Sequence, residues 1–384
     1  MVVKEVFLSS VEREKIIKIV RELLQYIGEM AQREADSAPS LQRNKYFSSL
    51  DALRGFAALA VAIYHIYIHW CGYLAVDFFL VLSGFVLSHV YLYSDRETNF
   101  AEFIGHRLAR LYPLHIYALI VFTAVYFMVY KHLPEAKDGL LFTFIQHLTL
   151  THNIGFNPKA ITWNYPSWSI SVEFWVNVLF VTFITKMTRS SVLFLVSLMG
   201  FVMIYNNSQT LDVAFTNYYG VLNSGMIRGI SSFLLGILAY RMYLWLCEKN
   251  DRIYRNPLLI NASEVITLSL SLLLMVRSSL RNGLDFCAPF AFTLTVVVFA
   301  MERGLISKTL KKFRYLGTIS YSIYLNQVAV MLLAWVLFKK PSVPSLPLLV
   351  VYLSILLVYS HLTYKYLEKP ARIKGRQLVD LLNI

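Results

Sequence analysis

The chain has 384 residues, of which 57% are hydrophobic and only 15% are charged, whereas an average soluble domain has about 25% charged residues. Its mean hydropathy is +0.53, and long apolar runs recur after residue 53. These values exclude a soluble enzyme, a disordered chain and a disulfide scaffold, and they predict an all-α polytopic membrane protein. The net charge of +13 requires no nucleic-acid partner, because basic residues also concentrate in the cytoplasmic loops of membrane proteins.

The N-terminal extension, residues 1–48, differs in composition from the rest of the chain. The first 50 residues are nearly neutral, with eight basic and seven acidic side chains. Ser9 and Glu12 have the spacing of a capping box, and apolar residues recur at helical spacing from Ile16 to Met30. We therefore predict a cytoplasmic amphipathic helix. It docks on the protein itself or on the membrane surface, or it pairs with a second copy in a homodimer.

Ten later stretches are long and apolar enough to cross a membrane, which takes about 20 residues. They lie at approximately 53–72, 74–93, 111–130, 167–186, 190–206, 221–246, 257–276, 284–302, 316–338 and 346–366. An eleventh stretch, 139–155, is weaker because it contains two histidines, a glutamine and an asparagine. We assign residues 49–373 to the membrane domain and residues 374–384 to a short cytoplasmic tail.

The distribution of lysine and arginine decides the number of spans and their orientation. With a cytoplasmic N-terminus and ten spans, 19 basic residues after the extension lie on the cytoplasmic side and seven lie outside. A full span at 139–155 would invert all later loops and place the basic ones outside. We therefore predict about ten transmembrane helices, one re-entrant or interfacial segment, and both termini on the cytoplasmic side of the plasma (bacterial inner) membrane.

Ionisable side chains within spans are costly and mark candidate functional sites; here they are Arg54, His65, Asp77, Glu173, Arg228 and Glu264. Arg54 and His65 share one helix face, about 16 Å apart along the axis. Arg54 is therefore expected near the cytoplasmic end and His65 beyond the middle. Asp77, Glu173 and Arg228 are expected at a similar depth in the outer half. A carboxylate there would orient the imidazole of a general base.

No metal ion is expected at His65. His65 and His69 have the i,i+4 spacing of some metal ligands, but no glutamate lies between them in an H-E-x-x-H pattern.

Two further features on the cytoplasmic half have alternative interpretations. Arg107 and Arg110 are one helical turn apart, and their guanidinium groups suit either the phosphates of a ligand or anionic lipid headgroups. Ser83 and Gly84 interrupt the second span with small residues, which permit either close helix packing or passage of a narrow ligand.

The chain resembles the membrane-bound acyltransferase-3 family at motifs that occur in order between about residues 48 and 373. They are L-D-A-L-R-G at 50–55 followed by His65, V-D-F-F-L-V-L-S-G-F at 76–85, R-L-A-R-L-Y-P at 107–113, W-S-I-S-V-E-F at 168–174, G-T-I-S-Y-S-I-Y-L at 317–325 and Y-L-E-K-P at 366–370. One departure is Asn326-Gln327, where many family members carry a histidine.

The resemblance implies a membrane O-acyltransferase. Its members commonly move an acetyl group from acetyl-CoA on the cytoplasmic side to a hydroxyl of an extracytoplasmic carbohydrate, such as an exported polysaccharide or lipopolysaccharide. His65 would be the general base, oriented by Asp77 or Glu173, and both direct transfer and an acyl-enzyme intermediate remain open. The implied catalytic residues are His65, Asp77 and Glu173; the implied CoA-binding residues are Arg54, Ser83, Arg107 and Arg110; the implied acceptor-binding residues are Trp168, Arg228 and Asn326.

Other functions remain open alongside this one. Buried charged residues also line the substrate pathways of transporters and flippases, although no internal repeat is visible in the sequence. Within the enzyme class, a lipid or an antibiotic is an alternative acceptor. The expected partners of the enzyme are acetyl-CoA, a glycan acceptor and membrane lipids.

The ten-span topology predicts opposite labelling of two loops. A cysteine introduced at Lys159 should react with a membrane-impermeant maleimide added outside the cell. A cysteine introduced at Lys249 should react only when the maleimide reaches the inside. Labelling of both from the same side of sealed cells would contradict the topology.

Overall fold

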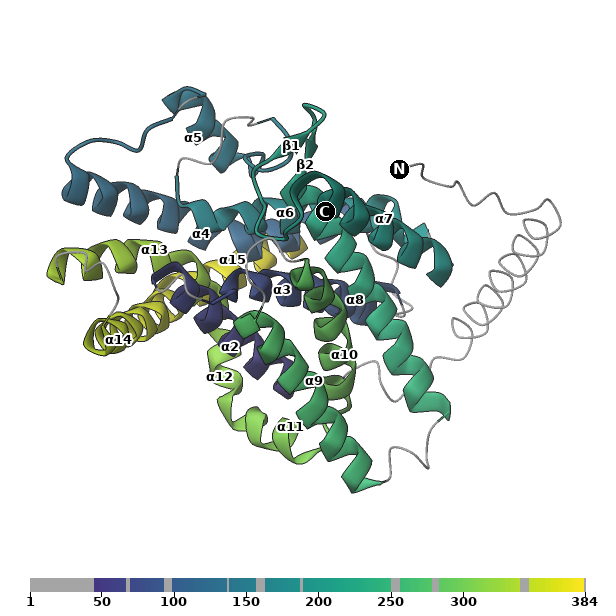
Figure 1. The fold of residues 1–384 in the computed structure, drawn as a ribbon. Coiled ribbons are helices and arrows are strands. Elements are labelled where there is room, and N and C mark those ends of the chain that lie inside the picture. The colour runs from purple at the N-terminus through teal and green to yellow at the C-terminus, as the bar shows by residue number, and fades with distance from the viewer. Residues whose placement is uncertain are drawn as a thin grey trace, which may run out of the picture.

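The structure is a computed structural model that describes residues 45–66, 70–92, 99–136, 138–156, 163–186, 189–249, 256–277, 283–338 and 345–382. Nearly all of the amphipathic extension predicted from the sequence lies outside these ranges. The described residues are almost entirely helical (Figure 1).

The helices follow one another along the chain with short connections. They are α2 (Ser48–Ile66), α3 (Ala75–Leu87), α4 (Phe100–Tyr130), α5 (Leu140–Leu148), α6 (Trp168–Thr182), α7 (Ser190–Ser208), α8 (Ser224–Lys249), α9 (Pro257–Arg277), α10 (Ala288–Met301), α11 (Leu305–Leu310), α12 (Arg314–Thr318), α13 (Ser320–Leu337), α14 (Leu346–Thr363) and α15 (Lys369–Leu381). Short 3₁₀ or π-helical turns extend several of them, including Gly72–Leu74 before α3 and Tyr364–Glu368 between α14 and α15. Strands β1 (Asn217–Tyr218) and β2 (Leu222–Asn223) form an antiparallel hairpin before α8.

Within the described residues, nine helical segments are long and apolar enough to cross a membrane, and they correspond to nine of the ten predicted spans. The all-α polytopic membrane fold predicted from the sequence is confirmed. The tenth predicted span, 167–186, contains α6, which has 15 residues and is shorter than the about 20 that a full crossing requires. Short 3₁₀ turns flank α6 at Tyr165–Ser167 and Ile184–Lys186.

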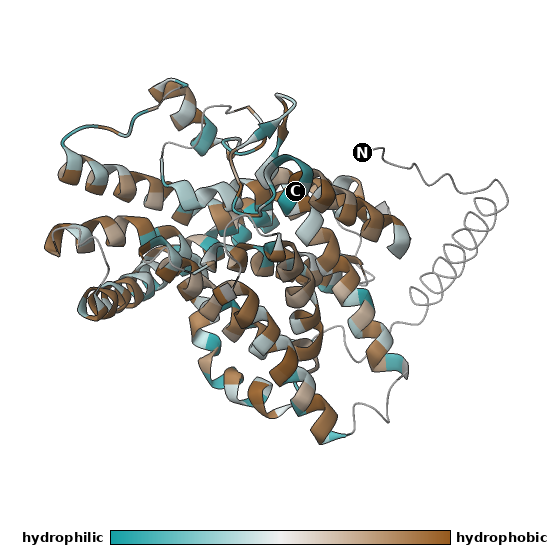
Figure 2. Ribbon diagram, viewed as in Figure 1, coloured by the Kyte–Doolittle hydropathy of each residue, from teal (hydrophilic) through white to brown (hydrophobic). Residues whose placement is uncertain are grey.

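The bundle has a buried centre and an apolar rim. Helices α3 and α8 pack closely because each has a glycine at the contact. A Cβ atom on Gly84 would collide with the backbone of Phe233, and one on Gly236 with the backbone of Val81. Helices α7, α9 and α14 lie at the periphery, where most of their apolar residues are not buried by protein. Figure 2 colours these helices mostly as hydrophobic, and their exposed apolar side chains suit contact with lipid tails.

Helix α5 corresponds to the segment predicted to be re-entrant or interfacial. Its nine residues are too few to span a bilayer. One face exposes Leu141, Phe142 and Ile145, whereas Gln146 and His147 are buried on the other. In Figure 1, α5 and the hairpin lie on one side of the molecule and α11 and α12 on the opposite side.

Three histidines fix the α5 segment to α4. The rings of His147 and His152 stack with centroids 3.8 Å apart, and His115 of α4 donates from Nε2 to the His147 carbonyl at 2.9 Å. His152 Nε2 bonds the Ser167 carbonyl at 3.0 Å. Burial lowers the pKa of both His147 and His152, to about 3 for His152. The stacked rings are therefore neutral, which avoids repulsion between two buried cations.

This cluster predicts acid sensitivity. An unfolded histidine titrates near pH 6.5, while the folded His152 ring stays neutral down to a pH of about 3. Between these values the unfolded state binds more protons, so the free energy of unfolding falls as the pH falls, by about 2 kcal/mol for His152 from pH 7 to pH 5. Thermal unfolding in detergent should show a shallower pH dependence for His152→Asn than for the wild type. The exposed His132→Asn is the control, and equal slopes for all three proteins would contradict the prediction.

Candidate active site

A cavity lies among α2, α3, α4, α6, α13 and α15. Its empty volume is about 910 Å³, including space open to solvent. Six charged side chains line it, namely Arg54, Arg107, Arg110, Arg372, Glu173 and Glu368. Four guanidinium groups against two carboxylates leave an excess of positive charge, which favours an anionic ligand. The remaining wall is apolar or carries hydroxyl groups, including Ser83 on α3 and Tyr324 on α13.

Arg54 is held on the cavity wall by α12 and α13. Its Nη2 donates to the Gly317 carbonyl at 2.7 Å and its Nε to Ser320 Oγ at 3.1 Å. Asp51, one turn earlier on α2, forms an ion pair with it at 3.1 Å. Helix α12 can approach α2 closely because Gly317 packs on the backbone of Asp51, where a Cβ atom would not fit. The guanidinium is therefore fixed in orientation before any ligand binds.

Arg107 and Arg110 project from the first third of α4 into the same cavity. The Arg107 guanidinium lies 5.5 Å from the centre of the Phe103 ring, a cation–π contact that holds its plane. Arg372 reaches the cavity from α15, which packs along α4. All four residues predicted to bind the cofactor, Arg54, Ser83, Arg107 and Arg110, thus line one cavity.

His65 lies eleven residues beyond Arg54 on α2 and does not line the cavity. Its Nδ1 is 3.1 Å from Gln327 Oε1. Gln327 Nε2 donates to the Tyr324 carbonyl at 2.9 Å, which directs the amide oxygen toward the ring. Nδ1 then carries the proton, and Nε2 has a free lone pair. Because Tyr324 lines the cavity, α13 connects the cavity to the histidine.

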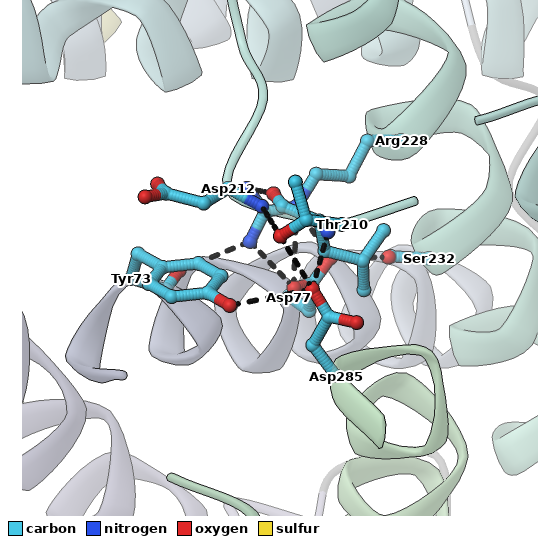
Figure 3. Close-up of polar contacts among 8 residues, drawn as sticks. Tyr73, Asp77, Thr210, Asp212, Arg228, Ser232 and Asp285 are labelled. Atoms are coloured by element: carbon cyan, nitrogen blue, oxygen red, sulfur yellow. Dashed lines mark hydrogen bonds and ion pairs between the residues drawn. The ribbon is translucent and has the colours of Figure 1, made fainter. Parts of the chain in front are cut away.

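A second polar cluster surrounds Arg228 (Figure 3). Arg228 of α8 makes a two-pronged contact with Asp77 of α3, Nε to Oδ1 at 3.0 Å and Nη2 to Oδ2 at 2.6 Å. Its other protons reach the carbonyls of Tyr73 and Leu211 at 3.0 and 2.7 Å. Ser232 donates to Asp77 Oδ1 at 2.8 Å. Arg228 is 1% exposed and Asp77 is 0% exposed, so the pair is closed to solvent.

Asp285 completes this cluster from the turn before α10. Its Oδ2 accepts bonds from Thr210 Oγ1 at 2.8 Å, from the Leu211 N–H and from Tyr73 OH at 3.3 Å. The neighbouring Asp212 is exposed and accepts from Tyr64 OH at 3.2 Å. Tyr64 adjoins His65, so this contact supports the C-terminal end of α2.

The structure corrects the expected grouping of His65 with carboxylates. Asp77 is occupied by Arg228, and Glu173 lines the arginine cavity rather than lying beside the histidine. The reason is the cost of an unpaired arginine in a low-dielectric interior, which exceeds that of leaving a neutral imidazole with an amide partner. Gln327, at the site of the departure from the family pattern, takes the place of the expected carboxylate.

Of the three residues predicted to bind the acceptor, Trp168 and Arg228 are in contact with each other, whereas Asn326 has a different partner. The Arg228 guanidinium lies over Trp168, 5.6 Å from the centre of the Trp168 ring. Trp168 also packs against the ring of Phe215. Asn326 is buried and donates to Thr363 Oγ1 at 2.9 Å. Neither lines the arginine cavity.

Three residues of this region were not predicted. Glu368 lies within the Y-L-E-K-P motif and accepts from Ser322 Oγ at 2.7 Å, so the motif could have indicated it. Gln327 was noted only as a departure, and Arg372 only as one of many cytoplasmic basic residues. Their roles depend on how α13 and α15 pack, which spacing along the chain does not reveal.

Comparison with known proteins places these features in a family. The family model of the acyltransferase domain matches residues 47–364. The O-acetyltransferase OatA of Staphylococcus aureus is 24% identical over 362 residues, covering 86% of this chain and 58% of that protein. The putative peptidoglycan O-acetyltransferase YrhL of Bacillus subtilis is 25% identical over 374 residues, 87% of this chain and 56% of the relative. The peptidoglycan O-acetyltransferase OatA of Listeria monocytogenes is 23% identical over 366 residues, with coverage of 86% and 56%.

The chain therefore spans a little over half the length of these relatives. No solved structure matches it.

The Asp77–Arg228 pair predicts a large stability effect. Asp77→Asn leaves a buried guanidinium without a counter-charge, and this should lower the free energy of unfolding by about 3–5 kcal/mol. Thermal unfolding in detergent measures the loss. The double variant Asp77→Leu/Arg228→Met removes both charges and should recover most of the stability. A single variant as stable as the wild type would show that the pair is not formed.

Proposed function

The chain belongs to the acyltransferase-3 family, and we propose that it is an integral-membrane O-acyltransferase that moves an acetyl group from acetyl-CoA on the cytoplasmic side to a hydroxyl of a cell-surface or exported glycan. One observation carries the proposal. Arg54, Arg107 and Arg110 meet in one cavity, and the helix that carries Arg54 also carries His65. One helix thus joins a site for a highly charged donor to a candidate base.

The cavity suits the nucleotide end of CoA. Its phosphates carry several negative charges, and guanidinium groups bind phosphate oxygens through paired N–H donors. Arg54 is already oriented by Gly317 and Ser320. Ser83, on the apolar wall formed by α3, would contact the narrow pantetheine arm. The arm would then extend along Phe79 and Tyr324, whose rings pack 5.8 Å apart, toward His65.

The transfer step uses His65 as general base. Nε2 would accept the proton of the acceptor hydroxyl while the hydroxyl oxygen attacks the thioester carbonyl. The carbon–sulfur bond then breaks, and the departing CoA thiolate takes up the proton held on His65 Nε2, which restores the base. Gln327 would hold the ring with Nε2 toward the acceptor. Asp77 would act at a distance, by fixing α3 against α8 through Arg228.

The acceptor would approach from the side of α5 and the hairpin. Because two of the relatives are named as peptidoglycan O-acetyltransferases, peptidoglycan is the acceptor to test before other envelope glycans. Membership of the acyltransferase family favours this function over a transporter or flippase. The same proposal places both termini in the cytoplasm of a bacterial cell.

His65 and Arg107 should affect different steps. In detergent with radiolabelled acetyl-CoA, His65→Ala should abolish acetyl transfer and thioester hydrolysis but leave CoA binding intact. Arg107→Ala should weaken CoA binding by about 10- to 100-fold, the effect of losing about 1.5–3 kcal/mol of charged hydrogen bonding.

Arg314→Ala, at an exposed arginine that does not line the cavity, is the matched control. Absence of CoA binding by the wild type, together with sugar uptake into vesicles, would refute the enzyme and favour a transporter.

Gln327 should behave as a positioning residue. Gln327→Leu removes the partner of His65 Nδ1 and should lower kcat with little change in KM, by a large part of the about 10²–10⁴-fold that general base catalysis contributes. Gln327→Glu places a carboxylate at the ring and stabilises its protonated form. The acid limb of the pH–rate profile should therefore move to higher pH. An unchanged profile in Gln327→Glu would show that the contact has no role in the reaction.

A further inference from the structure

A group of metal-ligand side chains lies where α4 begins and α15 ends. Glu102 and His106 are four residues apart on α4, so they share a helix face. Asp380 projects from α15, and its Oδ1 is 3.2 Å from His106 Nε2. One ligand atom from each of the three residues lies within 4.8 Å of the others. None of the three lines the arginine cavity.

The packing of the two helices fixes this arrangement. A Cβ atom on Gly105 would meet the side chain of Val379 at 2.8 Å, and one on Gly375 would meet Ala109 at 2.7 Å. The pairs Gly105 with Val379 and Gly375 with Ala109 run in opposite directions, so α4 and α15 are antiparallel at close contact. Small residues at such a contact allow the backbones to approach. His106 and Asp380 follow Gly105 and Val379 directly and are therefore held together.

We propose that Glu102, His106 and Asp380 form a binding site for a divalent transition-metal ion of the Zn²⁺ class. One imidazole and two carboxylates are ligands that Zn²⁺ accepts, whereas Mg²⁺ and Ca²⁺ prefer oxygen alone. Ligands at the usual Zn–N and Zn–O distances lie about 3.3 Å apart in a tetrahedral site, close to the 3.2 Å between His106 and Asp380. Glu102 offers a third ligand atom within 4.8 Å of those of His106 and Asp380.

The site is open on one side. The side chain of Asp380 is 64% exposed and that of His106 is 21% exposed, so water would provide the fourth ligand and the ion could enter from solvent. Two carboxylates compensate its charge. The Glu102 and His106 ligands come from a single helix face, so only Asp380 must be positioned by tertiary packing.

The ion would join the helices that carry three of the cavity arginines. Arg107 follows His106 directly, Arg110 lies one turn later, and Arg372 lies two turns before Asp380. Bound metal would therefore hold α15 against α4 and keep Arg372 facing the cavity. This function is structural and does not depend on acyl transfer.

Direct metal binding tests the proposal. The full chain, purified without a polyhistidine tag and treated with EDTA, is titrated in detergent with Zn²⁺ by calorimetry. We expect one equivalent to bind, with affinity reduced at least tenfold in His106→Ala and in Asp380→Asn. Co²⁺ should give visible absorption bands of tetrahedral coordination in the wild type and not in the variants. A large excess of Mg²⁺ should not displace Zn²⁺.

Controls distinguish loss of the site from loss of the fold. His132→Ala removes an exposed histidine that lies just beyond the C-terminal end of α4 and should bind Zn²⁺ as the wild type does. Each variant is first shown to melt like the wild type in EDTA, and Glu102→Gln replaces any variant that does not. Absence of stoichiometric Zn²⁺ binding in the wild type would overturn the proposal. Equal affinity in His106→Ala would do so too.

Discussion

An arginine inside a membrane protein must have its charge and its five N–H donors satisfied without water, and this requirement organises the core of the molecule. Arg228 meets it with Asp77 and two backbone carbonyls. These contacts join α8 to α3 and to the segment before the hairpin. Close packing at Gly84 and Gly236 depends on the same pair of helices. Because removal of one charge would leave the other buried, the ion pair and the helix contact support one another.

The arginines of the cavity differ from Arg228 in one physical respect. Arg54 has an acidic neighbour and two oxygen acceptors, but the cavity as a whole has four guanidinium groups and only two carboxylates. The imbalance is tolerable because the cavity is open to solvent, where water and counter-ions screen charge. An incoming phosphate would replace those ions. Thus arginine forms a buried ion pair between two helices in one place and lines an open, positively charged cavity in another.

Sequence reasoning succeeded where helix geometry alone decides the outcome. Span length and apolarity predicted nine span-length helices of the described chain, and spacing put Arg54 and His65 on one helix. Motifs identified three of the four cavity arginines. Reasoning failed where the rotation of one helix against another decides, because equal depth does not imply contact. We therefore predicted that Asp77 or Glu173 contacts His65. In the structure Asp77 pairs with Arg228, and Glu173 lines the cavity with the arginines.

The partner of His65 shows why such errors matter chemically. A carboxylate partner would stabilise the imidazolium and keep a negative charge in the membrane interior, at a cost in desolvation. Gln327 orients the ring as well but carries no charge, and its own amide is fixed by the Tyr324 carbonyl. The position at which the chain departs from the family pattern is thus the one that contacts the candidate base. A neutral partner suits a base that must be unprotonated before the acceptor arrives, and it leaves the carboxylates free to pair with arginine.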